Sequence, residues 1–181
     1  MILTYTLDEN DFLQHQLFAV TKSKRIKQQR RKSWLGISVT FLLLSLMFYQ
    51  SENNIMACYF LLFGLTSVFF YPLYQKRHYK NHYQKYIIDA YKNRFGQLVN
   101  IELKNESIEI NDITGETKIN LQNIQNITET KDYFYLEVKT GGHLIIPKSQ
   151  IANVDSLREL LKELCNKLSI EFISDLDWKW K

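Results

Sequence analysis

Charged residues are almost absent from residues 33–74, where Glu52 is the only one. The two apolar runs in this stretch, residues 34–49 and 55–74, would rise about 24 Å and about 30 Å as helices. A bilayer has a hydrocarbon core of about 30 Å, and a core helix of a soluble protein normally keeps a polar stripe, which neither run has. The sequence therefore predicts a transmembrane helical hairpin over residues 33–74, with its turn at residues 51–54.

Cysteine and the motifs of catalysis are also scarce. Cys58 falls in an apolar run and Cys165 in an expected C-terminal helix, so no disulfide framework is predicted. The chain has no P-loop, no HExxH helix and no Gly-x-Ser-x-Gly turn, and the acids of the later region alternate with apolar residues. We therefore expect a protein that is not an enzyme and that holds no cofactor and no metal ion.

The N-terminal region lacks the pattern of a cleavable signal peptide. The first apolar run begins only at Trp34, behind acids and a long basic segment, and no small-residue cleavage site follows it. The first apolar helix is therefore expected to remain as an anchor.

Positive charge is concentrated on both sides of the predicted hairpin. Residues 12–94 hold thirteen Lys and Arg against two acids, a net charge of +11. Residues 95–181 hold ten Lys and Arg against fourteen acids, a net charge of −4. Because Lys and Arg beside a span are retained in the cytoplasm, we expect a multi-pass protein with both termini cytoplasmic and the turn outside.

The basic residues next to the hairpin are candidates for contact with anionic lipid headgroups, at about 1 kcal/mol for each cation near the surface. Fixing the topology would require the same residues, so the two roles remain alternatives. Nucleic acid is not expected as a partner, because no stacking aromatics lie among these bases. The candidates are Lys22, Lys24, Arg25, Lys27, Arg30, Arg31 and Lys32 before the hairpin, and Lys76, Arg77 and Lys80 after it.

From Leu98 onwards the apolar residues alternate with polar ones, which predicts half-buried antiparallel strands separated by turn residues. Residues 2–7 are also β-branched and aromatic enough to form a strand, whose partner must lie downstream. The expected strands after the hairpin are 99–103, 108–110, 119–121, 124–130, 134–138 and 144–146.

Helical patterns occupy the remaining segments. Asp8 can cap a helix that is expected to continue through the basic run into the hairpin. A basic helix is expected over residues 75–96, with Gly96 as its stop. Residues 157–168 carry a leucine stripe and would be capped by Asp155 or Ser156.

These elements together predict an α+β membrane protein. The strands would form one strongly bent sheet of six or seven strands closed by the C-terminal helix, which is the architecture of pleckstrin-homology-like domains. The expected segments are 1–32 (N-terminal strand and basic amphipathic helix), 33–74 (hairpin), 75–96 (basic juxtamembrane helix) and 97–181 (cytoplasmic β domain).

Residues 124–151 contain three features in a fixed order. An Ile-x-x-Ile strand is followed by a Glu-x-Lys-Asp-Tyr turn into an aromatic strand, and an Ile-Pro-Lys strand end comes before the last helix. In these features the chain resembles the YcxB-like family of bacterial membrane proteins. The resemblance implies two spans, a pleckstrin-homology-like domain and a place in the bacterial plasma (inner) membrane, and it implies no activity.

Two smaller patterns leave alternatives open. His78 and His82 are four residues apart on one helix face, but no acid or cysteine lies within a turn of them, which favours interfacial histidines over a metal site. Trp178 and Trp180 could enter the membrane interface, fill a groove or pack on the domain's own core.

Two function classes follow from these patterns. The leading hypothesis is a non-enzymatic integral membrane protein whose β domain binds a protein partner or anionic inner-leaflet lipid. The alternative is a small transporter or channel subunit acting as a homo-oligomer, although the spans lack the ionisable residues that usually mark such pathways. Its pore would be lined by hydroxyl side chains, namely Ser38, Thr40, Ser45, Thr66 and Ser67.

Overall fold

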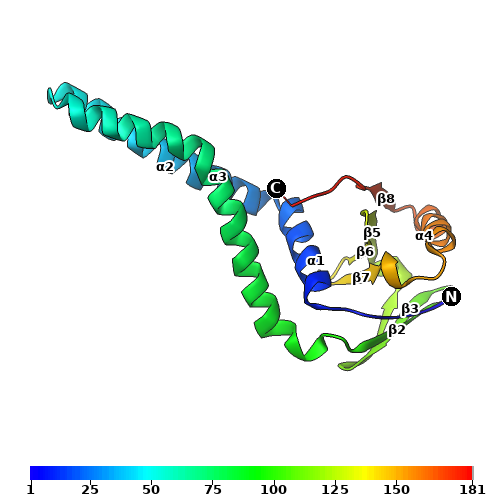
Figure 1. Ribbon diagram of the computed structural model, residues 1–181. Coiled ribbons are helices and arrows are strands. Elements are labelled where there is room, and N and C mark those ends of the chain that lie inside the picture. The colour runs from blue at the N-terminus through cyan, green and yellow to red at the C-terminus, as the bar shows by residue number, and fades with distance from the viewer. Residues whose placement is uncertain (181) are drawn as a thin grey trace. The chain divides into compact units, whose positions relative to one another are not determined.

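The computed structural model describes residues 1–180 and shows an α+β protein with two long apolar helices (Figure 1). The chain forms two compact units. The β-rich unit consists of residues 1–15 and 87–179, and the helical unit consists of residues 16–86 with Trp180. The hairpin is thus inserted in the sequence between two parts of the β-rich unit.

Eight strands and a C-terminal helix make up most of the β-rich unit. The strands are β1 (Ile2–Thr6), β2 (Leu98–Leu103), β3 (Ser107–Asp112), β4 (Gly115–Asn120), β5 (Ile124–Glu129), β6 (Tyr133–Val138), β7 (His143–Pro147) and β8 (Glu171–Ser174), and the helix is α4 (Val154–Leu168). Short 3-10 turns cover Lys92–Arg94, Leu121–Asn123 and Lys148–Gln150.

The strands divide into two four-stranded sheets, so the expectation of one bent sheet is wrong. The first sheet has the order β1-β2-β3-β4 and the second the order β7-β6-β5-β8. The 3-10 turn Leu121–Asn123 separates them, because its buried Leu121 ends the β3–β4 ladder before β5 begins. The six strands expected after residue 97 are all present.

The N-terminal strand finds its partner across the whole hairpin. β1 pairs antiparallel with β2, with Leu3 opposite Ile101 and Tyr5 opposite Val99. The prediction that residues 2–7 pair with a downstream strand is therefore confirmed. The inward positions of β1, Leu3 and Tyr5, are buried while Ile2 and Thr4 are exposed, which is the alternation of a half-buried edge strand.

The sequence analysis missed β8, the last strand. Glu171–Ser174 is only four residues long and pairs in parallel with β5, with Ile127 opposite Phe172. A parallel partner requires a crossover, and α4 supplies it on the path from β7 to β8. The unit is therefore not purely antiparallel.

The core of the β-rich unit comes from both sheets and from α4. Ile101 and Ile127 are fully buried, and so are Leu157 and Leu161 of α4, which packs against β5 and β8. Burying each such leucine contributes about 2 kcal/mol relative to leaving it exposed. The leucine stripe predicted for this helix therefore faces the core, in part through Leu157 and Leu161.

The cap of α4 differs from the expectation. Asn153 is the N-cap residue, and its side-chain oxygen accepts a hydrogen bond of 2.9 Å from the backbone N–H of Ser156. Asp155 and Ser156, the expected caps, lie in the first turn instead. The helix begins at Val154, one turn before the leucine stripe starts at Leu157. Val154 is only half-buried.

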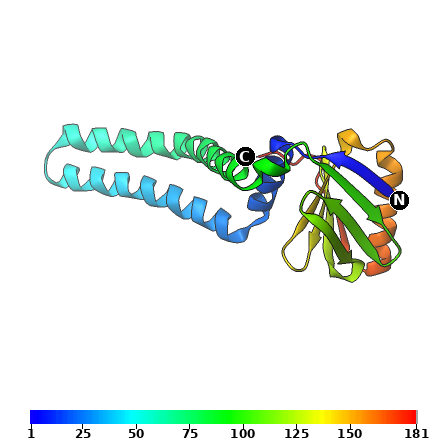
Figure 2. The ribbon, with the colours of Figure 1, turned by 90° about the horizontal axis from the view of Figure 1, so that it is seen from below.

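The helical unit contains most of α1 (Glu9–Lys22), all of α2 (Lys24–Gln50) and most of α3 (Asn54–Tyr91). Figure 2 shows α2 and α3 running alongside each other up to the turn that joins them. The continuous helix expected from residue 8 into the hairpin is interrupted at Ser23. That residue has extended backbone angles, and its hydroxyl caps α2 by accepting from the N–H of Ile26.

Each apolar run is continuous with a basic segment. The run 34–49 lies inside α2 with the basic residues 24–32, and the run 55–74 lies inside α3, which continues to Tyr91. Gly96 follows the 3-10 turn with a φ of +68°, a conformation that favours glycine, and its N–H donates to the carbonyl of Leu7 at 2.9 Å. The chain therefore leaves the helix close to where predicted.

Candidate functional site

The facing surfaces of α2 and α3 are joined by polar side chains. The hydroxyls of Ser38 and Ser67 are 3.1 Å apart, and Ser45 donates to the carbonyl of Ala57 at 2.8 Å. The hydroxyls of Ser33 and Tyr71 lie 2.7 Å apart near the basic end. These contacts form a polar seam between the helices, and Ser38 and Ser45 are buried in it.

One contact of the seam compensates for a proline. Pro72 lies inside α3 and has no N–H, so the carbonyl of Val68, four residues earlier, cannot receive its usual helical hydrogen bond. The indole N–H of Trp34 on α2 donates to this carbonyl at 3.2 Å. The side chain of one helix thus satisfies the backbone of the other.

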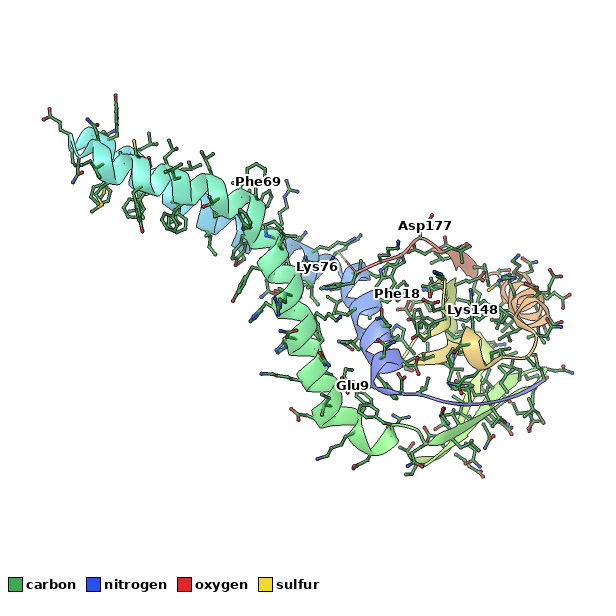
Figure 3. The ribbon with its side chains drawn as sticks, viewed as in Figure 1. Glu9, Phe18, Phe69, Lys76, Lys148 and Asp177 are labelled. Carbon is green, nitrogen blue, oxygen red and sulfur yellow. The ribbon has the colours of Figure 1, made fainter. Side chains whose placement is uncertain are left out.

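The outward surfaces of the two helices are apolar and exposed. Leu43 is 60% exposed, Leu62 62% and Phe69, which is labelled in Figure 3, 72%. Both helices are long and apolar enough to cross a membrane. The hairpin therefore buries the hydroxyls of Ser38 and Ser45 between its helices and exposes large apolar side chains, the reverse of a water-soluble helical pair.

The basic segments of α2 and α3 meet at the other end of the hairpin. The side-chain amide of Gln75 donates to the carbonyl of Arg30 at 3.1 Å, which brings together two segments that are 45 residues apart in sequence. Nine of the ten candidate basic residues lie on α2 or α3 near this contact, and Lys22 ends α1. The sequence-predicted basic residues thus belong to one region of the helical unit.

Arg30 lies close to two aromatic rings. Its guanidinium carbon lies 5.7 Å from the centre of the Tyr79 ring and 5.1 Å from that of Trp180, within cation–π distance of both. The Trp180 indole N–H also donates to the carbonyl of Lys76 at 3.2 Å. Arg30 is therefore held by aromatic rings, and Trp180 packs on the helical unit.

Two grooves lie along the helices near the basic end. The aromatic groove, of about 370 Å³, is lined by Phe63, Thr66, Ser67, Phe70, Tyr71 and Tyr74 of α3. The cationic groove, of about 520 Å³, is lined by Arg25, Gln28, Gln29, Lys32 and Ser33 of α2.

The histidine pair makes ring contacts. His78 stacks on Tyr74 with ring centres 5.6 Å apart, and His82 meets Tyr83 edge-on at 5.4 Å. Within residues 1–180, no group of three or more His, Cys, Asp or Glu side chains is arranged to hold a metal ion.

A buried ion cluster in the β-rich unit was not recognised from the sequence. Glu129 at the end of β5 accepts hydrogen bonds from Lys148 at 2.6 Å and from Arg158 of α4 at 2.9 Å. Glu129 is only 3% exposed. Lys148, which is labelled in Figure 3, also donates to the carbonyl of Thr130. In the sequence, the feature that could have indicated this cluster is Lys148, which directly follows the strand-ending Pro147.

A second buried polar cluster joins α1 to β6. The hydroxyl of Tyr133 donates to Asp11 at 2.8 Å, and the ring of His15 lies 5.3 Å from Tyr135 and 4.7 Å from His143. Burial, with a smaller effect of the nearby His143, lowers the pKa of His15 to about 4. Burial also raises the pKa of the Asp11 carboxyl. His15 is therefore neutral at physiological pH.

The fold and these sites define an α+β protein in which an apolar helical hairpin with a basic end separates the first strand of a β-rich unit from the other seven. Residues 103–164 match the model of the family described as YcxB-like protein, which confirms the family assignment for this part of the chain. The match includes all three residues of the ion cluster. Searches of curated proteins and of solved structures find no match.

Proposed function

We propose that this chain is a non-enzymatic membrane protein with two spans. The reversed polarity of the hairpin is the observation that carries this proposal. In hydrocarbon, helices associate through hydrogen bonds and close packing while apolar side chains face the lipid, and every backbone carbonyl needs a partner. The contact of Trp34 with Val68 meets this requirement at the one proline of the spans.

The pairing of β1 with β2 supports an orientation in which both ends of the hairpin lie on one side of the membrane. These strands directly flank the helical region in sequence, so the chain must enter and leave the bilayer on the same side for them to pair. The basic residues on both sides favour the cytoplasm for this side. The proposed location is the bacterial plasma membrane with both termini inside.

Cysteine labelling in intact cells tests insertion and orientation together. Cys58 and Cys165 are first replaced by serine, and a single cysteine is introduced at Glu52 in the turn or at Lys104 in the β-rich unit. An impermeant maleimide is expected to label E52C in intact cells and K104C only after permeabilisation. Labelling of both positions in intact cells would refute the orientation, and release of the chain by alkaline extraction would refute insertion.

The two units carry opposite charge, which assigns different partners to them. Residues 16–86 hold eleven Lys and Arg against one acid, a net charge of +10. The β-rich unit, residues 1–15 and 87–179, holds eleven against eighteen, a net charge of −7. An anionic leaflet attracts the first and repels the second. The proposed lipid contact therefore belongs to the helical unit, and the β-rich unit is proposed to bind a protein.

The architecture of the β-rich unit supports a pleckstrin-homology-like interaction module. Two four-stranded sheets are combined with an amphipathic helix whose leucines enter the core. The polar outer face of the first sheet forms a concave surface of about 530 Å³, to which Asn100, Glu109 and Lys118 contribute. This face is proposed to receive the protein partner.

Photo-crosslinking in native membranes tests this proposal. A photoreactive amino acid at Lys118 of the full chain is expected to give discrete protein adducts, whereas the same group at the buried Leu157 serves as a control without adducts. Adducts with lipid alone at position 118 would refute the protein-binding role.

The alternative of an oligomeric pore receives no support from the hydroxyl side chains expected to line it. Ser38, Ser45 and Ser67 bond within the hairpin, and Thr40 and Thr66 donate to carbonyls of their own helices. We therefore do not adopt it as the proposed function.

A further inference from the structure

The aromatic groove and the cationic groove meet at one hydrogen bond. Tyr71 lines the aromatic groove, Ser33 lines the cationic groove, and their hydroxyl oxygens lie 2.7 Å apart. An apolar surface on α3 thus continues into a polar and cationic surface on α2. The order from apolar to hydroxyl to cation complements the order of groups along a phospholipid, which runs from acyl chain to ester carbonyl to anionic phosphate.

The aromatic groove is chemically suited to an acyl chain. Its two aliphatic hydroxyls are occupied within α3, because Thr66 donates to the carbonyl of Phe63 at 3.1 Å and Ser67 to that of Gly64 at 2.7 Å. The remaining wall consists of aromatic rings, among which Phe70 is 67% exposed. A concave apolar surface within the hydrocarbon layer has to be filled by apolar groups.

The cationic groove offers the groups that bind a phosphodiester. Arg25 and Lys32 are seven residues apart and therefore lie on one face of α2, with Gln28 and Gln29 between them. Guanidinium, ammonium and amide groups all donate hydrogen bonds, and the first two supply the charge that favours an anion.

The hydroxyl pair lies between these two surfaces. When one hydroxyl of the Ser33–Tyr71 pair donates to the other, the accepting group keeps its own proton for an outside acceptor. In a lipid, the groups between the acyl chain and the phosphate are ester carbonyls, which are acceptors. The hydroxyl pair is therefore suited to the ester carbonyls of a lipid.

We propose that the joined grooves bind one anionic phospholipid, with an acyl chain in the aromatic groove and the phosphate at Arg25 and Lys32. This site rests on the proposed membrane insertion. It gives the lipid headgroup a defined position on α2, in place of a diffuse attraction to the whole basic run. It divides the ten candidate bases into two that bind the headgroup and eight that do not line the groove.

The basic run provides a matched control. R25Q/K32Q removes two cations from the groove, whereas K27Q/R31Q removes two cations from the same run at positions that do not line it. Both double variants change the net charge by the same amount, so diffuse electrostatics affects them alike. A site at the groove affects only the first.

The experiment uses the full chain in phosphatidylcholine bilayers with spin-labelled phosphatidylglycerol or spin-labelled phosphatidylcholine. The motionally restricted fraction gives the association of each lipid with the protein. The wild type is expected to prefer phosphatidylglycerol by roughly tenfold, a value below the full effect of two surface cations. R25Q/K32Q is expected to lose this preference and K27Q/R31Q to keep it.

A second pair of variants tests the acyl-chain part. T66W fills the aromatic groove and is expected to reduce the restricted fraction of phosphatidylglycerol. L62W adds the same side chain at a position that is 62% exposed and outside the groove, and it is expected to leave that fraction unchanged.

The outcomes separate this site from the function on which it rests. Equal loss of preference in R25Q/K32Q and K27Q/R31Q, or equal effects of T66W and L62W, would overturn the site while leaving insertion intact. Release of the wild type from membranes by alkaline carbonate would instead overturn the insertion itself.

Discussion

At the residue scale, the contact between Trp34 and the carbonyl of Val68 ties the identity of one residue to that of another on a different helix. Trp34 has a partner because Pro72 cannot supply an N–H. The contribution of the indole hydrogen bond to the stability of the hairpin therefore depends on the proline, and this dependence can be measured.

The first prediction concerns this pair. Trp34→Phe is expected to lower the stability of the hairpin by roughly 1 kcal/mol, the usual size of a hydrogen bond between membrane helices. In a Pro72→Ala background, the new N–H satisfies Val68 and the same substitution is expected to cost less. Unfolding in mixed micelles, followed by helical circular dichroism, gives the four free energies of the double-mutant cycle.

An additive cycle would contradict the role of Trp34 as a donor to the freed carbonyl. Phe70→Leu, on the exposed surface of α3, serves as a control whose effect is expected to be independent of Pro72.

A second residue-scale prediction concerns His15, whose lowered pKa links stability to pH. Because the folded protein disfavours the charged imidazole, the contribution of His15 is complete above pH 6.5 and declines as pH falls towards about 4. Asp11 acts in the opposite direction, since its raised pKa lets the folded state take up a proton more readily. The unfolding free energy of the wild type minus that of His15→Gln isolates the histidine.

This difference is expected to fall by up to about 1.4 kcal/mol per pH unit between pH 6.5 and pH 4.5. Denaturant unfolding of the full chain in micelles measures it. His78→Gln is the control, because His78 makes its ring contact on α3, outside the β-rich unit. A pH-independent difference for His15→Gln would show that the imidazole is not buried.

At the element scale, the ion cluster connects two strands of the second sheet with the helix α4. Glu129 ends β5, Lys148 follows β7, and Arg158 lies on α4. A buried carboxylate that keeps only one of two cationic partners loses compensation for its desolvation. The cluster thus fixes the position of α4 on the sheet.

Lys148→Met is therefore expected to destabilise the β-rich unit by about 3 kcal/mol, as breaking a buried pair usually does. Lys104→Met is the matched control, because Lys104 bonds to Glu109 at the exposed surface and such pairs contribute less than about 1 kcal/mol. Denaturant unfolding monitored by amide exchange in β5 compares the two. Equal effects of the two substitutions would contradict the role of burial.

The elements also show how far the sequence alone could lead. The hairpin and the six strands after residue 97 were predictable, because long apolar runs and period-two alternation are strong local patterns. The division into two sheets was not, since it depends on the short turn at Leu121, and β8 was missed because four residues carry too little pattern. The junction of the two grooves depends on the contact between Ser33 of α2 and Tyr71 of α3, and this is a tertiary property.

The ten basic residues illustrate the same limit within the candidate site. Their presence beside the spans follows from counting, but the special position of Arg30 depends on the rings of Tyr79 and Trp180. Those rings come from residues about 50 and 150 positions later in the chain. No local pattern connects them with Arg30.

At the scale of the whole molecule, the first strand holds the two halves of the chain together. If the turn between α2 and α3 is cut at an engineered protease site, the fragments are expected to copurify, because β1 pairs with β2 and α2 contacts α3. Leu3→Asp places a charge at a buried position of β1 and is expected to weaken this association. Thr4→Asp places it on the exposed face and is expected to leave it unchanged.

Separation of the wild-type fragments after cleavage would contradict the pairing of β1 with β2. Equal effects of Leu3→Asp and Thr4→Asp would contradict the register in which Leu3 faces the core.

The insertion of the hairpin between β1 and β2 has a consequence for biogenesis. The ribosome delivers β1 first, and its partner emerges only after both helices have been made. In the proposed membrane topology, a nascent chain that inserted a single helix would leave these strands on opposite sides of the bilayer, and the first sheet would lack its edge strand. Completion of the β-rich unit would then report correct insertion, and misinserted chains would present an unfinished domain to the proteases of quality control.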